Sequence, residues 1–154
     1  MSKLSPSNNN NNLVIIGHMG SGKSTIGLYL AKKLSYSFID TDELIVKKIK
    51  MSISEYFKNF GEKEFRLIEE KTILDLLDKN TKNIIAFGGG AFQSFRVRQS
   101  VKKNATSIWL KCDLKTLAFR CSRKKNRPLL QDKNIKSVLK ELNKLRADNF
   151  AKAN

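Results

Sequence analysis

Short apolar runs alternate along this chain with stretches in which apolar residues recur every three or four positions. The runs predict four strands, at 13–16, 36–39, 83–87 and 106–110. The periodic stretches predict helices at 24–34, 43–49, from 52 to a break at Gly61, 62–77, 94–103, 113–121 and from 135 onward. Strands that alternate with helices predict an α/β fold with a parallel sheet, and 154 residues suffice for one domain.

The most informative stretch, Gly17 to Thr25, lies between the first strand and the first helix and reads Gly-His-Met-Gly-Ser-Gly-Lys-Ser-Thr. It fits the pattern G-x-x-x-x-G-K-[ST], and the flanking strand and helix are the context that confirms such a match. Backbone amides and the positive end of the helix dipole would attract phosphate. Lys23 would neutralise the β- and γ-phosphates, and the Ser24 hydroxyl would ligate Mg²⁺. The alternative is a chance glycine turn before an ordinary helix.

Two further polar or glycine-rich segments follow predicted strands. Asp40-Thr41-Asp42 comes after the second strand, and Gly88-Gly89-Gly90 comes after the third. The carboxyl edge of a parallel sheet is where α/β proteins bind ligands, so a metal or acid–base role for the aspartates is favoured over simple helix capping. The three glycines would let backbone amides approach a ligand closely.

Other candidate residues leave alternatives open. Arg66 is flanked by acids at 62, 64, 69 and 70, so it is either a site residue or one half of a surface ion pair. Phe57 and Phe65 fit either the core or a pocket wall. The basic segment 120–132, broken by a proline, suits a mobile flap over bound phosphates or a solvated loop.

The last predicted helix carries a clean apolar face, made of Ile135, Val138, Leu139, Leu142 and Leu145. Arg146 follows that face directly.

The formal charge of +16 changes the picture little. Nucleic-acid binding is one interpretation, but the basic residues are spread along the chain and no aromatic residues alternate with them, so we expect no nucleic-acid partner. A basic surface would still attract small anions such as ATP or a carboxylate.

Composition also bears on cellular location. No apolar run is long enough to span a membrane and no secretory h-region is present, so we expect no membrane association. Cys112 and Cys121 lack metal-ligand spacing and suit the reducing cytoplasm. Residues 1–12 are asparagine-rich and predicted to be a disordered head, ahead of a single domain at 13–154 that we expect to be monomeric.

Taken together, these segments resemble the shikimate kinase family over residues 13 to about 151. The matching segments are 17–25, Asp-Thr-Asp at 40–42, Gly-Glu-Lys-Glu-Phe-Arg-Leu-Ile-Glu at 61–69, Gly-Gly-Gly-Ala at 88–91, Arg-Pro-Leu at 127–129 and Arg146. The resemblance implies a P-loop kinase of three layers, with a parallel five-stranded sheet between helices. It also implies transfer of the γ-phosphoryl group of ATP to the 3-hydroxyl of shikimate, in aromatic amino-acid biosynthesis.

The resemblance assigns roles to individual positions. The implied ATP-binding residues are Gly20, Ser21, Gly22, Lys23, Ser24, Thr25 and the lid arginine Arg127. Mg²⁺ would be held by Ser24 and Asp40. The implied shikimate-binding residues are Asp42, Phe57, Phe65, Arg66, Gly89 and Arg146. The catalytic residues would be Lys23, Asp42, as the base, and Arg127.

The chain departs from the family pattern at two points. Phe150 stands where the family usually has a tyrosine, and the chain ends at Asn154, where a fifth strand, an adenine loop and a terminal helix are expected. We therefore expect a domain that is incomplete at its C-terminus, with its lid at about 120–133. Alternative functions are a gluconate- or nucleoside-monophosphate-type kinase, an inactive nucleotide-binding fragment, or a nucleic-acid-binding protein.

Overall fold

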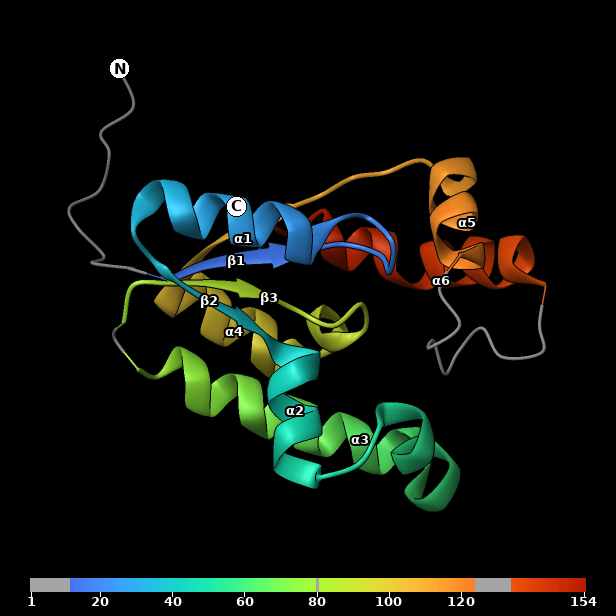
Figure 1. Cartoon of the computed structure of the whole chain (residues 1–154), viewed down its shortest axis with the longest axis horizontal. Coiled ribbons are helices and arrows are strands. Elements are labelled where there is room, and N and C mark those ends of the chain that lie inside the picture. Colours follow the sequence, from blue (N-terminus) through green and yellow to red (C-terminus); the bar gives the residue numbers. More distant parts are fainter. Residues whose placement is uncertain (1–11, 80, 124–133) are drawn as a thin grey trace.

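A four-stranded parallel sheet forms the centre of the protein, with strand order β2-β3-β1-β4 (Figure 1). The computed structural model describes residues 12–79, 81–123 and 134–154. The strands are β1 (Asn12–Ile16), β2 (Ser37–Asp40), β3 (Asn83–Ala86) and β4 (Ala105–Trp109). Every boundary lies within one residue of the predicted one, which confirms the α/β class. The fifth strand implied by the resemblance is not among the described elements.

The register of the sheet brings all four carboxyl ends to one edge. Val14 of β1 pairs with Ile85 of β3 and with Ser107 of β4, and Ile39 of β2 pairs with Ile85. Since every pair is parallel, the segments that leave the strands meet at that edge. They include the phosphate loop, the Asp40–Asp42 segment and the triple glycine.

Helices cover both faces of the sheet, as the three-layer prediction requires (Figure 1). On one face, Ile15 and Ile84 pack against Ala31 of α1 (Lys23–Leu34). On the other face, side chains from α3 (Ile53–Leu77), α4 (Phe95–Asn104) and α6 (Ile135–Phe150) build the larger core around Val14, Ile16 and Ile85. Alternate residues of β1 therefore belong to different cores, as expected for a strand buried on both faces.

The other described elements are α2 (Thr41–Ile49), the 3-10 turn η1 (Ala91–Gln93) and α5 (Leu114–Ser122). Helix α2 begins two residues before the prediction, because Asp40 serves as its N-cap. The predicted break at Gly61 is confirmed. Gly61 has φ 86° and ψ 164°, which are not helical values, and the resulting kink divides α3 into two helical segments. No described helix has both the length and the apolar character needed to cross a bilayer.

The predicted apolar face of the last helix is wrong at its final position. Leu145 is 72% exposed, whereas the next residue, Arg146, is only 5% exposed. The inward face runs through Leu139, Arg146 and Phe150, which are seven and four residues apart and therefore lie on one side of a helix. An apolar pattern cannot reveal that a charged residue holds an inward position.

A testable consequence concerns the close approach of α1 to the sheet at Gly27. A Cβ atom there would overlap the ring of Phe38 on β2 and lie 3.4 Å from Ile15 Cδ1. We expect Gly27→Ala to lower stability by about 1–3 kcal/mol, the usual cost of overpacking, although alanine favours helix by about 1 kcal/mol. Urea unfolding measures the change, with the exposed Lys32→Ala as the control on the same helix. A variant at least as stable as the parent would contradict this packing.

Candidate functional site

The loop between β1 and α1 has the backbone that its glycines predict. Gly17, Gly20 and Gly22 have φ of 150°, 81° and 94°, values that favour glycine, and Gly22 is the N-cap of α1. The predicted ATP-binding residues 20–25 form this turn and the first helical turn. Lys23 Nζ donates to the carbonyl oxygens of Gly17 at 3.0 Å and His18 at 2.9 Å, so the loop wraps around its own cation. Arg127 lies outside the described residues.

The predicted metal residues are in contact with each other. Ser24 Oγ donates to Asp40 Oδ2 at 2.7 Å, while Asp40 Oδ1 accepts from the amides of Asp42 at 3.0 Å and Glu43 at 3.3 Å. Asp40 is therefore both a helix cap and a partner of the phosphate loop, so the two interpretations of this aspartate are compatible. A hydroxyl and a carboxylate beside a phosphate loop fit Mg²⁺, which binds one or two protein oxygens together with substrate phosphates. The described residues contain no cluster of three or more His, Cys, Asp or Glu side chains that could hold a metal.

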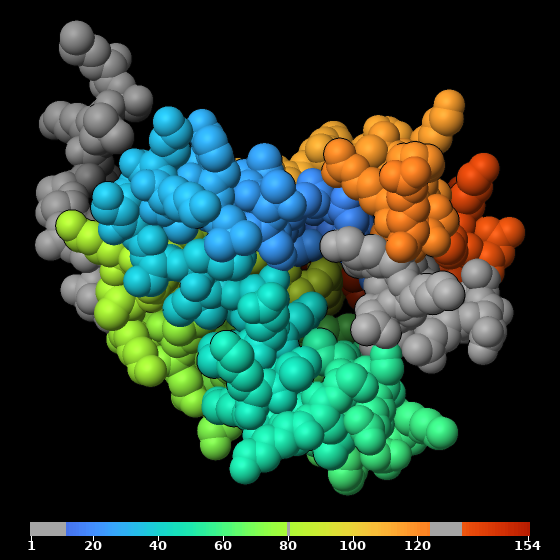
Figure 2. Space-filling model, viewed as in Figure 1, coloured from blue at the N-terminus to red at the C-terminus, as the bar shows by residue number. Residues whose placement is uncertain are grey.

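A cavity of about 410 Å³ opens next to the phosphate loop. Met19 contributes to its wall from that loop, and all six residues predicted to bind shikimate line it: Asp42, Phe57, Phe65, Arg66, Gly89 and Arg146. The cavity walls come from α2, α3, the glycine loop and α6, and Figure 2 shows α2 and the first part of α3 (blue-green to green) projecting from the body of the molecule. Phe65 is buried and Phe57 is half-buried, with their ring centroids 5.1 Å apart. Both rings therefore line the cavity, and Phe65 also belongs to the core.

The triple glycine forms one wall of the cavity, against which three charged side chains rest. A Cβ on Gly88 would lie 2.5 Å from Asp42 Oδ1, and one on Gly90 would lie 2.6 Å from the Arg66 guanidinium. A Cβ on Gly89 would lie 3.2 Å from Arg146 Nη1. The first two distances are shorter than any real contact, so any other residue at 88 or 90 would displace the charged group.

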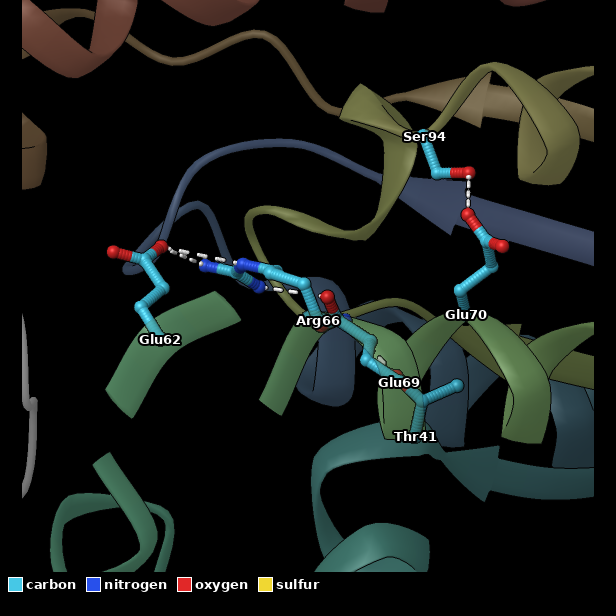
Figure 3. A network of polar contacts seen from close by, with 7 residues as sticks. Thr41, Glu62, Arg66, Glu69, Glu70 and Ser94 are labelled. Atoms are coloured by element: carbon cyan, nitrogen blue, oxygen red, sulfur yellow. Dashed lines mark hydrogen bonds and ion pairs between the residues drawn. The ribbon is translucent and has the colours of Figure 1, made fainter. Parts of the chain in front are cut away.

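Arg66 is held by two acids of its own helix (Figure 3). Its Nη2 and Nε donate to Glu62 Oε1 at 2.9 and 3.2 Å, and its Nη1 donates to Glu69 Oε2 at 2.7 Å. The ion-pair interpretation of Arg66 is thus confirmed, but one partner is buried and the guanidinium lines the cavity. These bonds use three of its five N–H groups and fix the orientation of the other two.

Arg146 is a buried cation. Its Nη1 is inaccessible and has no hydrogen-bond partner among the described residues. Burial, and then the positive charge of Arg66, lower the pKa of Arg146 to about 10. The cavity therefore contains two guanidinium groups, and that of Arg146 lacks a full set of partners among the described residues. An anion bound there would offset the desolvation of Arg146 and the repulsion between the two cations.

Two buried residues to which the motifs assign no role also shape the site. Thr41 Oγ1 accepts the amide hydrogen of Gly88 at 3.0 Å and so attaches the start of α2 to the glycine loop. Glu69 pairs with Arg66, and its Oε1 is buried with no hydrogen-bond partner among the described residues. Both residues belong to motifs quoted above. Their burial, which marks them as part of the site, could not be predicted from the sequence.

A third residue beside the site that had no individual role in the sequence analysis is Arg120, which is exposed on α5. Its Nη1 donates to the carbonyl of Gly20 at 3.1 Å, which adds a second cation beside the phosphate loop. Its position in a basic segment was visible in the sequence, but its direction toward the loop was not.

The buried carboxyl of Glu69 leads to a pH-dependent prediction. Burial, reinforced by the nearby charge of Asp42, raises the pKa of Glu69 above its ordinary value despite the ion pair with Arg66. The folded protein therefore binds a proton at this carboxyl at pH values where the unfolded chain does not. Ionised Glu69 costs stability at neutral pH, and the cost disappears as the pH falls through the raised pKa toward the unfolded value near 4.5.

We expect the unfolding free energy of the parent protein, relative to Glu69→Gln, to rise as the pH falls from about 8 to about 5, by about 1.4 kcal/mol for each unit by which the pKa is raised. Urea unfolding across this range measures the difference. The exposed Glu64→Gln variant controls for the loss of one negative charge. A difference that shrinks with falling pH would mean that the Arg66 pair, not burial, dominates this carboxyl.

Comparisons with known proteins agree with this geometry. The family model described as shikimate kinase matches residues 19–154. A shikimate kinase of Bartonella henselae is 47% identical over 152 residues, which is 99% of this chain and 72% of the relative, and one of Bartonella quintana is 46% identical over 142 residues, which is 92% of this chain and 67% of the relative.

Solved structures lead to the same family. The structure of shikimate kinase from Acinetobacter baumannii in complex with shikimate has a TM-score of 0.88 and 33% identity, and the match covers 91% of this chain and 78% of that chain. A gluconokinase from Sinorhizobium meliloti, at 16% identity and a TM-score of 0.57, covers 88% of this chain and 74% of that chain and shares only the fold. Motifs, cavity and comparisons together lead to one conclusion: this chain belongs to the shikimate kinase family.

Proposed function

We propose that this chain transfers the γ-phosphoryl group of ATP to the 3-hydroxyl of shikimate, forming shikimate 3-phosphate for aromatic amino-acid biosynthesis. One observation carries the proposal: a single cavity beside the phosphate loop contains Asp42 and two guanidinium groups, those of Arg66 and Arg146. Shikimate offers a carboxylate for the arginines and hydroxyls for the aspartate.

We assign the carboxylate of shikimate to Arg66 and Arg146. A planar carboxylate matches the fork of N–H groups on arginine better than it matches the point charge of lysine. Arg66 is already oriented by Glu62 and Glu69. Arg146 has a buried N–H group that finds no partner within residues 12–79, 81–123 and 134–154. Phe57 and Phe65 would flank the ring of the substrate, and the backbone of Gly89 would contact it.

We assign the reacting hydroxyl to Asp42. Its carboxylate lines the cavity beside Gly88, and its backbone amide donates to Asp40, which is bonded to Ser24 after the phosphate loop. There it can orient the 3-hydroxyl and accept its proton as the phosphoryl group is transferred. Glu69 then acts through Arg66 and is a positioning residue.

We assign the phosphates of ATP to residues 20–25, with Lys23 as the cation against the transferred group. Mg²⁺, when bound, neutralises charge on the β- and γ-phosphates, and Ser24 and Asp40 have the oxygen donors to hold it. Arg127 is proposed as the lid arginine by the family resemblance. Phosphoryl transfer needs positioning and charge compensation above all, and these residues supply both. We also propose a cytoplasmic location, a reducing compartment that suits Cys112 and Cys121, which form no disulfide among the described residues.

A coupled assay that follows ADP release tests the proposed function. We expect release that depends on shikimate and on Mg²⁺, with no comparable release when gluconate replaces shikimate. Equal rates with gluconate, or release that ignores the acceptor, would contradict the substrate assignment.

The phosphate site is tested by Lys23→Ala. Removing a charge-stabilising group that is already in place costs about a hundredfold or more in kcat, so we expect a loss of at least that size. The exposed Lys32→Ala on the same helix is the control. Near-normal turnover of Lys23→Ala would rule out the assignment of the loop.

The carboxylate site is tested by Arg66→Lys. A charge-assisted hydrogen bond contributes about 1.5–3 kcal/mol, so the KM for shikimate should rise roughly tenfold or more while the KM for ATP changes little. Arg96→Lys is the matched control, because Arg96 also pairs with an acid of α3, Glu70 at 2.9 Å, but lies outside the cavity. An ATP effect as large as the shikimate effect would mean that Arg66 is misassigned.

A further inference from the structure

The inner face of α6 carries two amides, one turn before and one turn after Arg146. Asn143 Oδ1 lies 3.0 Å from His18 Nε2 in the phosphate loop. Asn149 Nδ2 donates at 2.7 Å to Gln93 Oε1 of η1, directly after the glycine loop. The helix that carries Arg146 is therefore bonded both to the loop assigned to ATP and to the segment beside the loop assigned to shikimate.

These two hydrogen bonds matter because α6 packs mainly against elements other than the sheet. Among the described elements its principal neighbours are α5 and η1, and it joins the main core at its C-terminal end, through Phe150. The residues at 143, 146 and 149 recur at helical spacing, so a rotation or slide of α6 that breaks the amide bonds also moves the guanidinium.

His18 is built into this contact. It is 4% exposed, and its ring meets the ring of Phe150 edge-on, with centroids 5.0 Å apart and planes at 87°. Its backbone carbonyl accepts from Lys23 Nζ at 2.9 Å, so the residue that contacts α6 also holds the phosphate-loop cation. Since Asn143 Oδ1 is an acceptor, Nε2 carries the hydrogen of the neutral ring. Burial first, and then the charges of Arg146 and Lys23, lower the pKa of His18 and keep it neutral, although the bond to Asn143 opposes this shift.

We propose that His18 and Asn143 form a positioning pair that fixes Arg146 over the glycine loop and couples the phosphate loop to the carboxylate site. Neither residue touches the reacting atoms, so both act through Arg146 and Lys23. The inference rests on the proposed role of Arg146. It goes beyond that role because it makes His18, a residue of the phosphate loop, a determinant of shikimate affinity.

The test uses steady-state kinetics of His18→Phe, Asn143→Leu and the double variant. His18→Phe keeps an aromatic ring against Phe150 but removes the N–H donor, and Asn143→Leu removes the acceptor. We expect each single variant to raise the KM for shikimate about five- to tenfold, with a smaller fall in kcat and an ATP KM within about twofold. Because the two residues act as one unit, the double variant should be no worse than either single variant.

Rescue separates positioning from general stability. His18→Gln retains an N–H donor in place of Nε2 and should recover most of the shikimate KM. Ser107→Ala is the structural control: Ser107 is 1% exposed and bonded to Asn154 at 2.9 and 3.0 Å, away from the cavity. It should lower the melting temperature without changing the shikimate KM. If His18→Phe does not fold cooperatively, Asn143→Leu carries the test, since Asn143 is only half-buried.

Two results would overturn the inference, and they differ from failure of the proposed function. Multiplicative effects in the double variant would show that the two residues act independently. An unchanged shikimate KM in both single variants, alongside a raised KM in Arg146→Lys, would show that Arg146 does not need the pair. An unchanged KM in Arg146→Lys itself would instead refute the role assigned to that arginine, and the pair would fall with it.

Discussion

The buried guanidinium of Arg146 is the constraint on which the site depends. A cation that is 5% exposed, with a second guanidinium nearby and an N–H group that has no partner in the described part of the chain, is costly unless something compensates it. The protein supplies partial compensation through the charges of Glu62 and Glu69, which offset the repulsion from Arg66. A carboxylate substrate would complete it. Because that cost is met during folding, the site is organised to bind an anion before the substrate arrives.

The parallel sheet explains how distant parts of the chain cooperate in this site. Each of the first three strands delivers one component at its carboxyl end: the phosphate loop after β1, the aspartates after β2 and the glycine loop after β3. Thr41 and His18 then connect these components sideways, to the glycine loop and to α6 respectively. Along this edge of the sheet, the glycine loop after β3 lies between the phosphate loop after β1 and the aspartates after β2.

Much of this arrangement could be predicted from the sequence, because the motifs are local. The strands were located to within a residue, and the six predicted substrate residues line one cavity. The last helix shows where local patterns fail: Leu145 fits the apolar period but is exposed, whereas Arg146 is buried and lines the cavity. The role of His18 was likewise beyond prediction, since it comes from a contact with Asn143, 125 positions away, that only the fold brings into place. The pair of Glu69 with Arg66 is local and could be expected, but the burial of Glu69 could not.

The central claim is that two arginines recognise the carboxylate of the substrate, and equilibrium binding tests it without relying on turnover. Shikimate and its methyl ester share ring and hydroxyls but differ in the negative charge. Titration calorimetry of both ligands against the parent protein should give at least about tenfold weaker binding of the ester, the loss expected when one charge-assisted bond is removed. Equal affinity for the two ligands would contradict the account.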